Sequence, residues 1–407
     1  MSLRSIPTPT AGAVPSTPAP GPLKRVGRVI VALIGSFLAF LVAAIVLGAY
    51  LPAIPKAGVI GPVLGGQYPF HIAVIALLGV GLGVLAGRSG LVRWGRTVTV
   101  ITALSSAGAL TIGGIQFAAA RQAGTEVSFG QVFSGLGYPD STPDTTTTYA
   151  GPDGRPLNAD LYLPRQTSGR PAGKVPAIVL AHAGGFHTFD KSDLRGTGRW
   201  LADHGVAVVA VDYRLAAPGH PTWNEAPQDL VSALGWVQQN AEHYGIDASR
   251  ISLGGMSAGG ALAMNAAYRL QAGTITPSAG DMPRPPASVV GFYPGTDVTQ
   301  MWKDDIAGTR EAAELFTGGT PQQYPERYRE VSPTTGMRSD LPRTLLVVGD
   351  RDRSARPKTV TDFADALRAQ GVDAQVKKLP FAEHAFDDAY GSLTSQTSRQ
   401  ILLDFLI

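Results

Sequence analysis

The sequence has no cysteine among its 407 residues. Disulfide bonds and thiol nucleophiles are therefore excluded, and this composition is compatible with an exported domain that is stable without cross-links. Seven histidines are present, and no metal-ligand spacing stands out among them. We therefore expect no bound metal.

A second absence divides the chain into two unlike parts. Residues 1–125 contain no aspartate or glutamate but nine lysines and arginines, whereas the remainder has 25 basic against 31 acidic residues. The sequence pI of about 9.0 combines a basic front part with an acidic domain. It therefore does not indicate nucleic-acid binding, and we expect no nucleic-acid partner.

Three uncharged windows lie between the basic residues of the front part. We predict a membrane domain over 29–120, with transmembrane helices at about 29–51, 70–87 and 97–120, because about 20 apolar residues span a bilayer. The third window is rich in small residues that suit close packing against the other two helices. A cleaved signal peptide is the alternative for the first window, and a soluble cap is the alternative for the other two.

The distribution of basic residues predicts an orientation in the membrane. Basic residues precede the first window and separate the second from the third, whereas only Lys56 lies between the first and the second. Because basic residues favour the cytoplasmic side, the N-terminus is predicted inside and the chain after the third helix outside. The residues concerned are Lys24, Arg25, Arg28, Arg88, Arg93 and Arg96.

The structure of the remaining segments is predicted from their composition and sequence pattern. Residues 1–28 are rich in proline, threonine, serine and alanine, which predicts a disordered cytoplasmic tail. Residues 121–144 are predicted to form a linker. Residues 145–407 contain apolar strand-like runs and a helical pattern after one of them, and we predict that they form one domain.

A G-x-S-x-G pentapeptide centred on Ser257 lies between a strand-like run at 251–253 and a helix-like run at 258–270. This arrangement is typical of a nucleophile elbow, in which a strained turn exposes the serine Oγ above the sheet. Glycine is frequent in this chain, at 49 residues, so the pentapeptide needs partners elsewhere before it has much weight.

Candidate partners follow in the order serine, acid, histidine. Asp350 and Asp352 come directly after the strand-like run 344–348, and His384 follows the run 374–379. Serine needs a base, histidine titrates near neutrality, and a buried carboxylate fixes the imidazole tautomer. We predict the catalytic triad Ser257, Asp352 and His384, with Asp350 as the alternative acid.

A glycine-rich loop follows another strand-like run at 177–181. Gly184 and Gly185 could offer backbone N–H groups to a tetrahedral oxyanion, because no Cβ obstructs the approach. We assign them, together with the N–H of Ala258, to an oxyanion hole. An ordinary strand-to-helix turn is the alternative.

With these motifs, the chain from about Thr145 onwards resembles an α/β-hydrolase of the hormone-sensitive-lipase and bacterial carboxylesterase group. Four segments carry the resemblance: 182–185, 212–215, 255–259, and the acid and histidine after the last two strands. For residues 145–407 the resemblance implies an α/β-hydrolase fold, with a mostly parallel sheet and helices on both faces, preceded here by the three predicted transmembrane helices. It also implies ester hydrolysis through an acyl-enzyme, with no metal or organic cofactor. The sequence departs from the family pattern in two places. Ala183 replaces a glycine of the usual His-Gly-Gly-Gly loop, and the loop 216–220 replaces the usual Ala-Pro-Glu.

Several other polar and aromatic side chains lie outside the predicted triad and oxyanion hole. Asp212, Arg214 and Asp229 are interpreted as structural. The segment 293–333 is predicted either to shape the substrate pocket or to pack as helices on the sheet. Its aromatic residues are Trp302, Phe316, Tyr324 and Tyr328, and His187, His220 and Trp223 are further candidates for the mouth of the pocket.

The sequence therefore predicts a membrane-anchored serine hydrolase with an extracytoplasmic catalytic domain. Its substrate would be a carboxylic ester of modest size on a lipid, a glycan or a small molecule. An acyltransferase with the same triad and a sugar or lipid acceptor is one alternative. A non-catalytic binding module on the hydrolase scaffold is the other.

Overall fold

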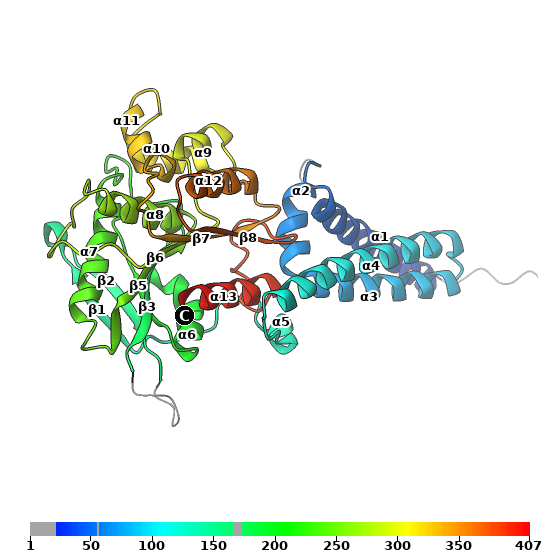
Figure 1. Cartoon of the computed structure of the whole chain (residues 1–407). Helices are drawn as coiled ribbons and strands as arrows, with labels where there is room; N and C mark the ends of the chain where they lie inside the picture. The colour runs from blue at the N-terminus through cyan, green and yellow to red at the C-terminus, as the bar shows by residue number, and fades with distance from the viewer. Residues whose placement is uncertain (1–21, 55–56, 166–172) are drawn as a thin grey trace, which may run out of the picture.

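The computed structural model describes residues 22–54, 57–165 and 173–407. A helical bundle at the N-terminal end projects from a domain built around one sheet (Figure 1). Residues 1–21 of the predicted tail, and Lys56, lie outside the described residues.

The sheet has eight strands in the order β1-β2-β4-β3-β5-β6-β7-β8. Strand β2 runs antiparallel to both of its neighbours, β1 and β4, and all the other pairs are parallel. This sheet confirms the predicted α/β fold class. The strands are β1 Thr145–Ala150, β2 Leu157–Tyr162, β3 Val175–Ala181, β4 Ala207–Val211, β5 Ile246–Met256, β6 Ser288–Phe292, β7 Arg343–Gly349 and β8 Ala374–Leu379.

Helices cover both faces of the sheet. Helices α7, α8 and α12 lie on one face, and α6 and α13 lie on the other (Figure 1). Strands covered on both faces are apolar at consecutive positions rather than at alternate ones, as in β4, whose five residues are all buried. The helices of this domain are α6 Arg195–Asp203, α7 Glu225–Asn240, α8 Ala258–Gln271, α9 Val298–Asp304, α10 Thr309–Thr317, α11 Pro325–Val331, α12 Pro357–Ala369 and α13 Leu393–Leu406.

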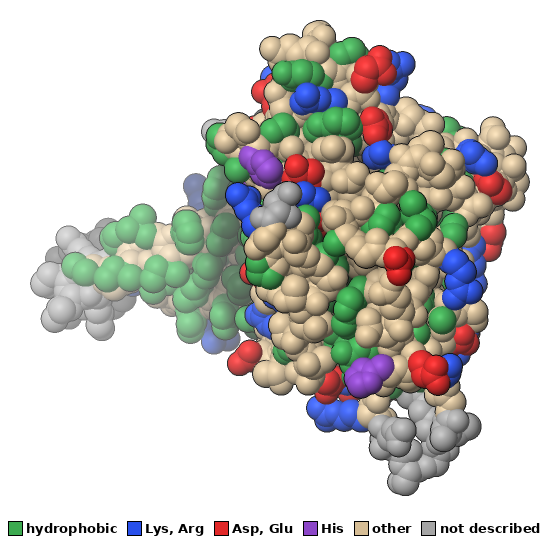
Figure 2. Space-filling view, turned by 90° about the vertical axis from the view of Figure 1, so that its left-hand side faces the viewer, with side chains coloured by type: hydrophobic (Ala, Val, Ile, Leu, Met, Phe, Trp, Pro, Cys, Tyr) green, Lys and Arg blue, Asp and Glu red, His purple; other side chains and the backbone are tan. Residues whose placement is uncertain are grey.

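Three helices of the N-terminal bundle are long and apolar enough to cross a membrane, by length and composition. They are α1 Pro22–Tyr50, α3 Pro69–Arg88 and α4 Val92–Gln122. The short helix α2 Ala57–Ile60 and a π-helical turn at Gly61–Gly66 connect α1 to α3. The exposed surface of the bundle is mainly apolar, whereas the sheet domain presents mixed charges (Figure 2).

Two of these elements differ from the sequence predictions. Helix α1 begins at Pro22, inside the segment 1–28 that was predicted to be disordered, because proline is well accommodated in a first helical turn, where its missing N–H is not needed. The predicted linker 121–144 contains helix α5, Phe129–Ser134. Ser128 caps it through Oγ, which accepts from the N–H of Gln131 at 3.3 Å.

Candidate active site

Ser257 occupies the sharp turn between β5 and α8. Its φ of 50° and ψ of −114° are strained for a residue with a side chain, and such strain is concentrated at functional sites. The turn is tightly packed, because a Cβ on Gly259 would lie 2.4 Å from the carbonyl oxygens of both Ala181 and His182. The elbow therefore abuts the loop that leaves β3.

The structure brings the three predicted triad side chains together. Ser257 Oγ lies 2.8 Å from Nε2 of His384. The other ring nitrogen of His384, Nδ1, lies 3.0 Å from Oδ2 and 3.2 Å from Oδ1 of Asp352. The Asp352 side chain is fully buried, and its Oδ1 also accepts from the N–H of Ala355 at 2.7 Å. A serine hydroxyl, an imidazole and a buried carboxylate thus form a continuous chain of hydrogen-bonding groups.

The alternative acid, Asp350, does not contact His384 in the described structure. Its Oδ1 lies 3.9 Å from Nε of Arg351. Burial raises the pKa of Asp350, partly offset by the charge of Arg351. The geometry favours Asp352 as the acid that orients the imidazole.

The surroundings of His384 act on its pKa in opposite directions. Burial of the ring lowers the pKa, whereas the charge and hydrogen bond of Asp352, and the charges of Glu383 and Asp387, raise it. The raising effects outweigh burial, so the pKa of His384 lies above its ordinary value. The imidazolium that forms when His384 takes a proton is therefore stabilised by nearby carboxylates.

Further groups around the histidine were not predicted from the sequence. The ring of Tyr293 packs edge-on against that of His384, with centroids 4.6 Å apart, and its hydroxyl donates to Oδ1 of Asp387 at 2.5 Å. Burial, together with the charge of Asp388, raises the pKa of Asp387 to about 6. Tyr293 directly follows β6, at the edge of the sheet where the other site residues gather, and this position was the available signal in the sequence.

The predicted oxyanion loop follows β3, next to the elbow. Strands β3 and β5 are parallel neighbours, with Ala181 opposite Gly255. Gly184 has a φ of 116°, and a Cβ there would lie 2.0 Å from the carbonyl oxygen of Thr188, so only glycine fits. Within the described part of the chain, the amides of Gly184 and Gly185 donate no hydrogen bond to the protein.

The third predicted donor, Ala258, is the first residue of α8, where a backbone N–H has no partner within the helix. In the described part of the chain, the N–H groups of Gly184, Gly185 and Ala258 thus have no backbone acceptor.

Polar and aromatic residues make further contacts at and near the loop that follows β3. Tyr213 stacks on His182 with ring centroids 4.3 Å apart, and its hydroxyl donates to the carbonyl of His182 at 3.1 Å. Arg214 forms a two-point ion pair with the buried Asp229 through Nε and Nη2, at 2.9 and 2.8 Å. Asp212 pairs with Lys191 at 3.2 Å. These contacts fit the structural roles that were predicted for Asp212, Arg214 and Asp229.

The segment 293–333 forms helices α9, α10 and α11, which lie beyond α8 and α12 on the same side of the sheet (Figure 1). Phe316 is buried and stacks on Phe186, which follows the oxyanion glycines, with ring centroids 4.1 Å apart. Tyr328 is buried as well, and Trp302 donates through Nε1 to Glu314 at 2.7 Å. These aromatic side chains pack the helices, and Phe316 also holds the covering layer against the oxyanion loop.

The remaining candidates for the mouth of the pocket make contacts of their own. His187 Nδ1 lies 2.8 Å from the carbonyl oxygen of Gly185, and His220 Nε2 lies 3.4 Å from Glu225. The guanidinium of Arg327 lies over the rings of Trp223 and Tyr324. In the described ranges, no group of three or more His, Cys, Asp or Glu side chains is placed to hold a metal ion.

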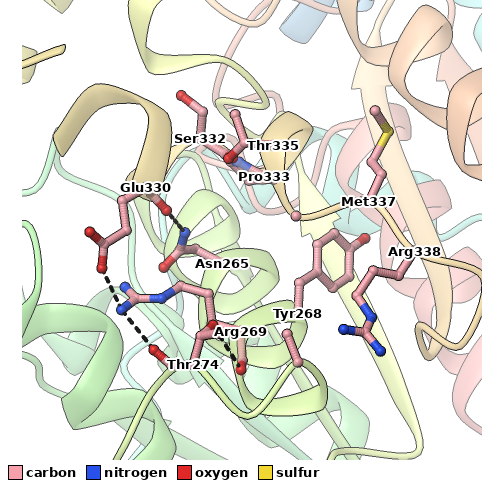
Figure 3. Close-up of a pocket in the computed structure, with 12 residues that line it drawn as sticks. Asn265, Tyr268, Arg269, Thr274, Glu330, Ser332, Pro333, Thr335, Met337 and Arg338 are labelled. Carbon is pink, nitrogen blue, oxygen red and sulfur yellow. Dashed lines mark hydrogen bonds and ion pairs between the residues drawn. The ribbon is translucent and has the colours of Figure 1, made fainter. Parts of the chain in front are cut away.

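A cavity of about 330 Å³ lies elsewhere, beside the C-terminal half of α8 (Figure 3). Asn265 and Arg269 line this cavity, and both contact Glu330. Nδ2 of Asn265 donates to the backbone carbonyl of Glu330. Nη2 of Arg269 forms an ion pair with its carboxylate. Asn265 lies two helical turns beyond Ser257, which is roughly 12 Å at 1.5 Å per residue. The cavity is therefore separate from the triad.

Comparison with known proteins places this chain in a family. The BD-FAE family model matches residues 159–367, which is half of the chain and covers the elbow and the acid. Esterase LipC of Mycobacterium tuberculosis is 31% identical over 213 residues, which are 50% of this chain and 51% of the relative. The chain thus spans about half the length of that protein. Ethyl acetate hydrolase of Pseudomonas putida is 35% identical over 262 residues, which are 61% of this chain and 76% of the relative.

A solved structure shares the fold. It is a thermophilic esterase, Est2, of the Planctomycetes species Thermogutta terrifontis with propionate bound, and it is 23% identical with a TM-score of 0.54. The match covers 66% of this chain and 94% of that structure.

Proposed function

Since this chain belongs to the BD-FAE family, as its resemblance to the hormone-sensitive-lipase group predicts, we propose that it is a membrane-anchored serine hydrolase. It cleaves carboxylic esters through an acyl-enzyme intermediate. The observation that carries the proposal is the alignment of Ser257 Oγ, His384 and Asp352 through contacts of 2.8 and 3.0 Å.

In the first half of the reaction, Nε2 of His384 takes the proton of the Ser257 hydroxyl while Oγ attacks the ester carbonyl carbon. The carbonyl electrons move to the oxygen, which accepts hydrogen bonds from the N–H groups of Gly184, Gly185 and Ala258. When the tetrahedral intermediate collapses, the carbon–oxygen bond to the alcohol breaks. The leaving alcohol takes the proton from Nε2, and the acyl group remains on Ser257.

In the second half, water replaces the alcohol. His384 takes a proton from the water, whose oxygen attacks the acyl carbon, and the same N–H groups receive the oxyanion. Collapse of this intermediate releases the carboxylic acid and returns the proton to Oγ of Ser257. Throughout, Asp352 holds Nδ1 of His384 protonated, so that Nε2 faces the serine as an acceptor.

The substrate we propose is a carboxylic ester of modest size. The relative from Pseudomonas putida is named for ethyl acetate, an ester with a small acyl group and a small alcohol. In this chain α10 covers the oxyanion loop closely, because a Cβ on Gly185 would lie 3.3 Å from Cβ of Ala312. This close packing of α10 against the loop supports a substrate with a small acyl group.

We also propose that the N-terminal bundle anchors the enzyme, with its N-terminus in the cytoplasm and the sheet domain outside. Three helices of sufficient length and apolarity support the anchor. The loop between α3 and α4 lies at the end of the bundle remote from the sheet domain (Figure 1); Arg88 is the last residue of α3, and Arg93 and Arg96 lie in the first turns of α4. Basic residues at that end support its placement on the cytoplasmic side.

The test uses full-length protein in membranes from expressing cells, treated with a fluorescent fluorophosphonate. We expect the wild type to be labelled and Ser257→Ala not to be. Ser249→Ala, at an exposed position near the start of β5, is the matched control and should be labelled like the wild type. The labelled enzyme should also hydrolyse p-nitrophenyl acetate. If the folded wild type and Ser257→Ala give the same signal, the proposal is wrong.

A further inference from the structure

The loop that carries His384 lies directly against the N-terminal bundle. Nε2 of Gln116, on α4, donates to the carbonyl of Gly66 at 2.8 Å and to the carbonyl of Pro380 at 3.1 Å. Nε2 of Gln67 donates to the carbonyl of Ala385 at 3.1 Å. The loop is therefore held on both sides of the histidine by residues more than 260 positions away in the sequence.

Close packing accompanies these hydrogen bonds. A Cβ on Gly66 would lie 2.0 Å from the carbonyl oxygen of Phe381, so the π-helical turn touches the backbone of the loop. The ring of Phe381 is met edge-on by that of Tyr50 at 5.1 Å, and the guanidinium of Arg351 lies 5.1 Å from the same ring. The loop of His384 therefore packs against three parts of the bundle: the end of α1, the turn after α2 and the end of α4.

The backbone of the loop needs such support. Phe381 and Ala385 have φ angles of 56° and 54°, in the left-handed region that residues with side chains rarely adopt. Each such residue costs on the order of 1–3 kcal/mol, and it persists only where surrounding contacts hold it. His384 lies between the two strained positions.

Gln116 is unusual for its helix. It is 2% exposed in a helix that is otherwise apolar or small at its buried positions, and burying an amide is unfavourable unless its hydrogen bonds are made. Its Nε2 donates once within the bundle and once to the loop, whereas its buried Oε1 has no hydrogen-bond partner among the described residues. A purely membrane-anchoring helix has no need for this group.

We propose that Gln116, assisted by Gln67, is a positioning residue that fixes the loop of His384, so that the bundle is part of the catalytic scaffold as well as an anchor. This inference rests on the proposed function. The bundle contributes no atom to the reaction. It determines where Nε2 of His384 lies relative to Oγ of Ser257, and a misplacement of about 1 Å in an active site can cost about 100-fold in rate.

The experiment compares Gln116→Met with Gln122→Met in the full chain, in detergent micelles. Methionine has nearly the size of glutamine and no amide. Gln122 is exposed at the end of the same helix, which makes it the matched control. We expect Gln116→Met to lower kcat for p-nitrophenyl acetate about tenfold with KM unchanged, because the loop moves the histidine but not the substrate. Gln122→Met should keep the wild-type kcat.

A folding control separates positioning from stability. Gln116→Met and Gln67→Met are both measured at a temperature at which fluorescence and limited proteolysis show them folded, and the fluorophosphonate labelling rate is measured alongside. A labelling rate that falls with kcat in the folded Gln116→Met variant supports the inference. Unchanged kcat and labelling rate in that folded variant overturn it. If the wild type itself is not labelled, the proposed function fails instead.

Discussion

Asp352 and not Asp350 meets the imidazole of His384, with Oδ2 3.0 Å from Nδ1. The two carboxylates are two positions apart after β7, so their comparison is a sharp test of the site. We expect Asp352→Asn to lower kcat by about 10⁴-fold, because an amide no longer holds the required tautomer. Asp350→Asn, which keeps the size and removes the charge in the same turn, should keep kcat within a few-fold of the wild type. Equal losses in the two variants would contradict the assignment. Steady-state kinetics on the full-length enzyme measures both.

The pH dependence of the reaction follows from the surroundings of His384. The protonated ring cannot take the serine proton, so kcat/KM falls as the pH drops through the pKa of His384. Because this pKa is raised above 6.5, the midpoint of the acid limb should lie above pH 6.5. In Asp352→Asn the charge that raises the pKa is gone while burial still lowers it, so the midpoint should move to lower pH. A midpoint that stays in place in this variant would show that another group controls the limb.

Gly184 offers a test of the oxyanion loop. An added methyl group at its φ of 116° would collide with the carbonyl of Thr188 and displace the N–H groups of the loop. Loss of one oxyanion donor typically costs about 100-fold or more, so we expect Gly184→Ala to lower kcat by at least that factor. Gly137→Ala is the control, since a Cβ at Gly137 meets nothing within 4 Å. A Gly184→Ala enzyme with normal kcat would exclude the loop from the oxyanion hole.

Because the chain has no cysteine, cysteines introduced one at a time can report on which side of the membrane each position lies. Single cysteines can be introduced as Ser249→Cys in the sheet domain and as Thr8→Cys in the N-terminal tail, outside the described residues. With a membrane-impermeant maleimide we expect intact cells to label the first variant, and to label the second only after permeabilisation. The opposite pattern would invert the proposed topology.

Local patterns predicted a strand-to-helix turn at Ser257 and a loop after a strand at His384, because both features depend on a short stretch of sequence. They predicted Asp352 as the acid with Asp350 as the alternative, and they could not exclude that alternative. That choice depends on a turn in which the N–H of Asp352 donates to the carbonyl of Gly349 at 3.2 Å, and both aspartates fit the same sequence pattern.

Tertiary contacts explain what the sequence did not predict. Helix α5 has only six residues, and its start is held by Gln396, whose side chain bonds both the N–H and the carbonyl of Ser128. A helix so short is stabilised by packing rather than by its own propensity. Gln116 likewise gave no signal, because a glutamine in an apolar run is informative only once the loop that it contacts is known.

The close contact between Gly66 and Phe381 has a consequence for how this chain can change over generations. Because no side chain fits at residue 66 while the carbonyl of Phe381 stays in place, the helical region and the histidine loop must vary together. Exchange of the helices for those of a relative would then be accepted only with matching changes around Phe381. Substitutions in the helical region and in the loop of His384 are therefore coupled at this contact.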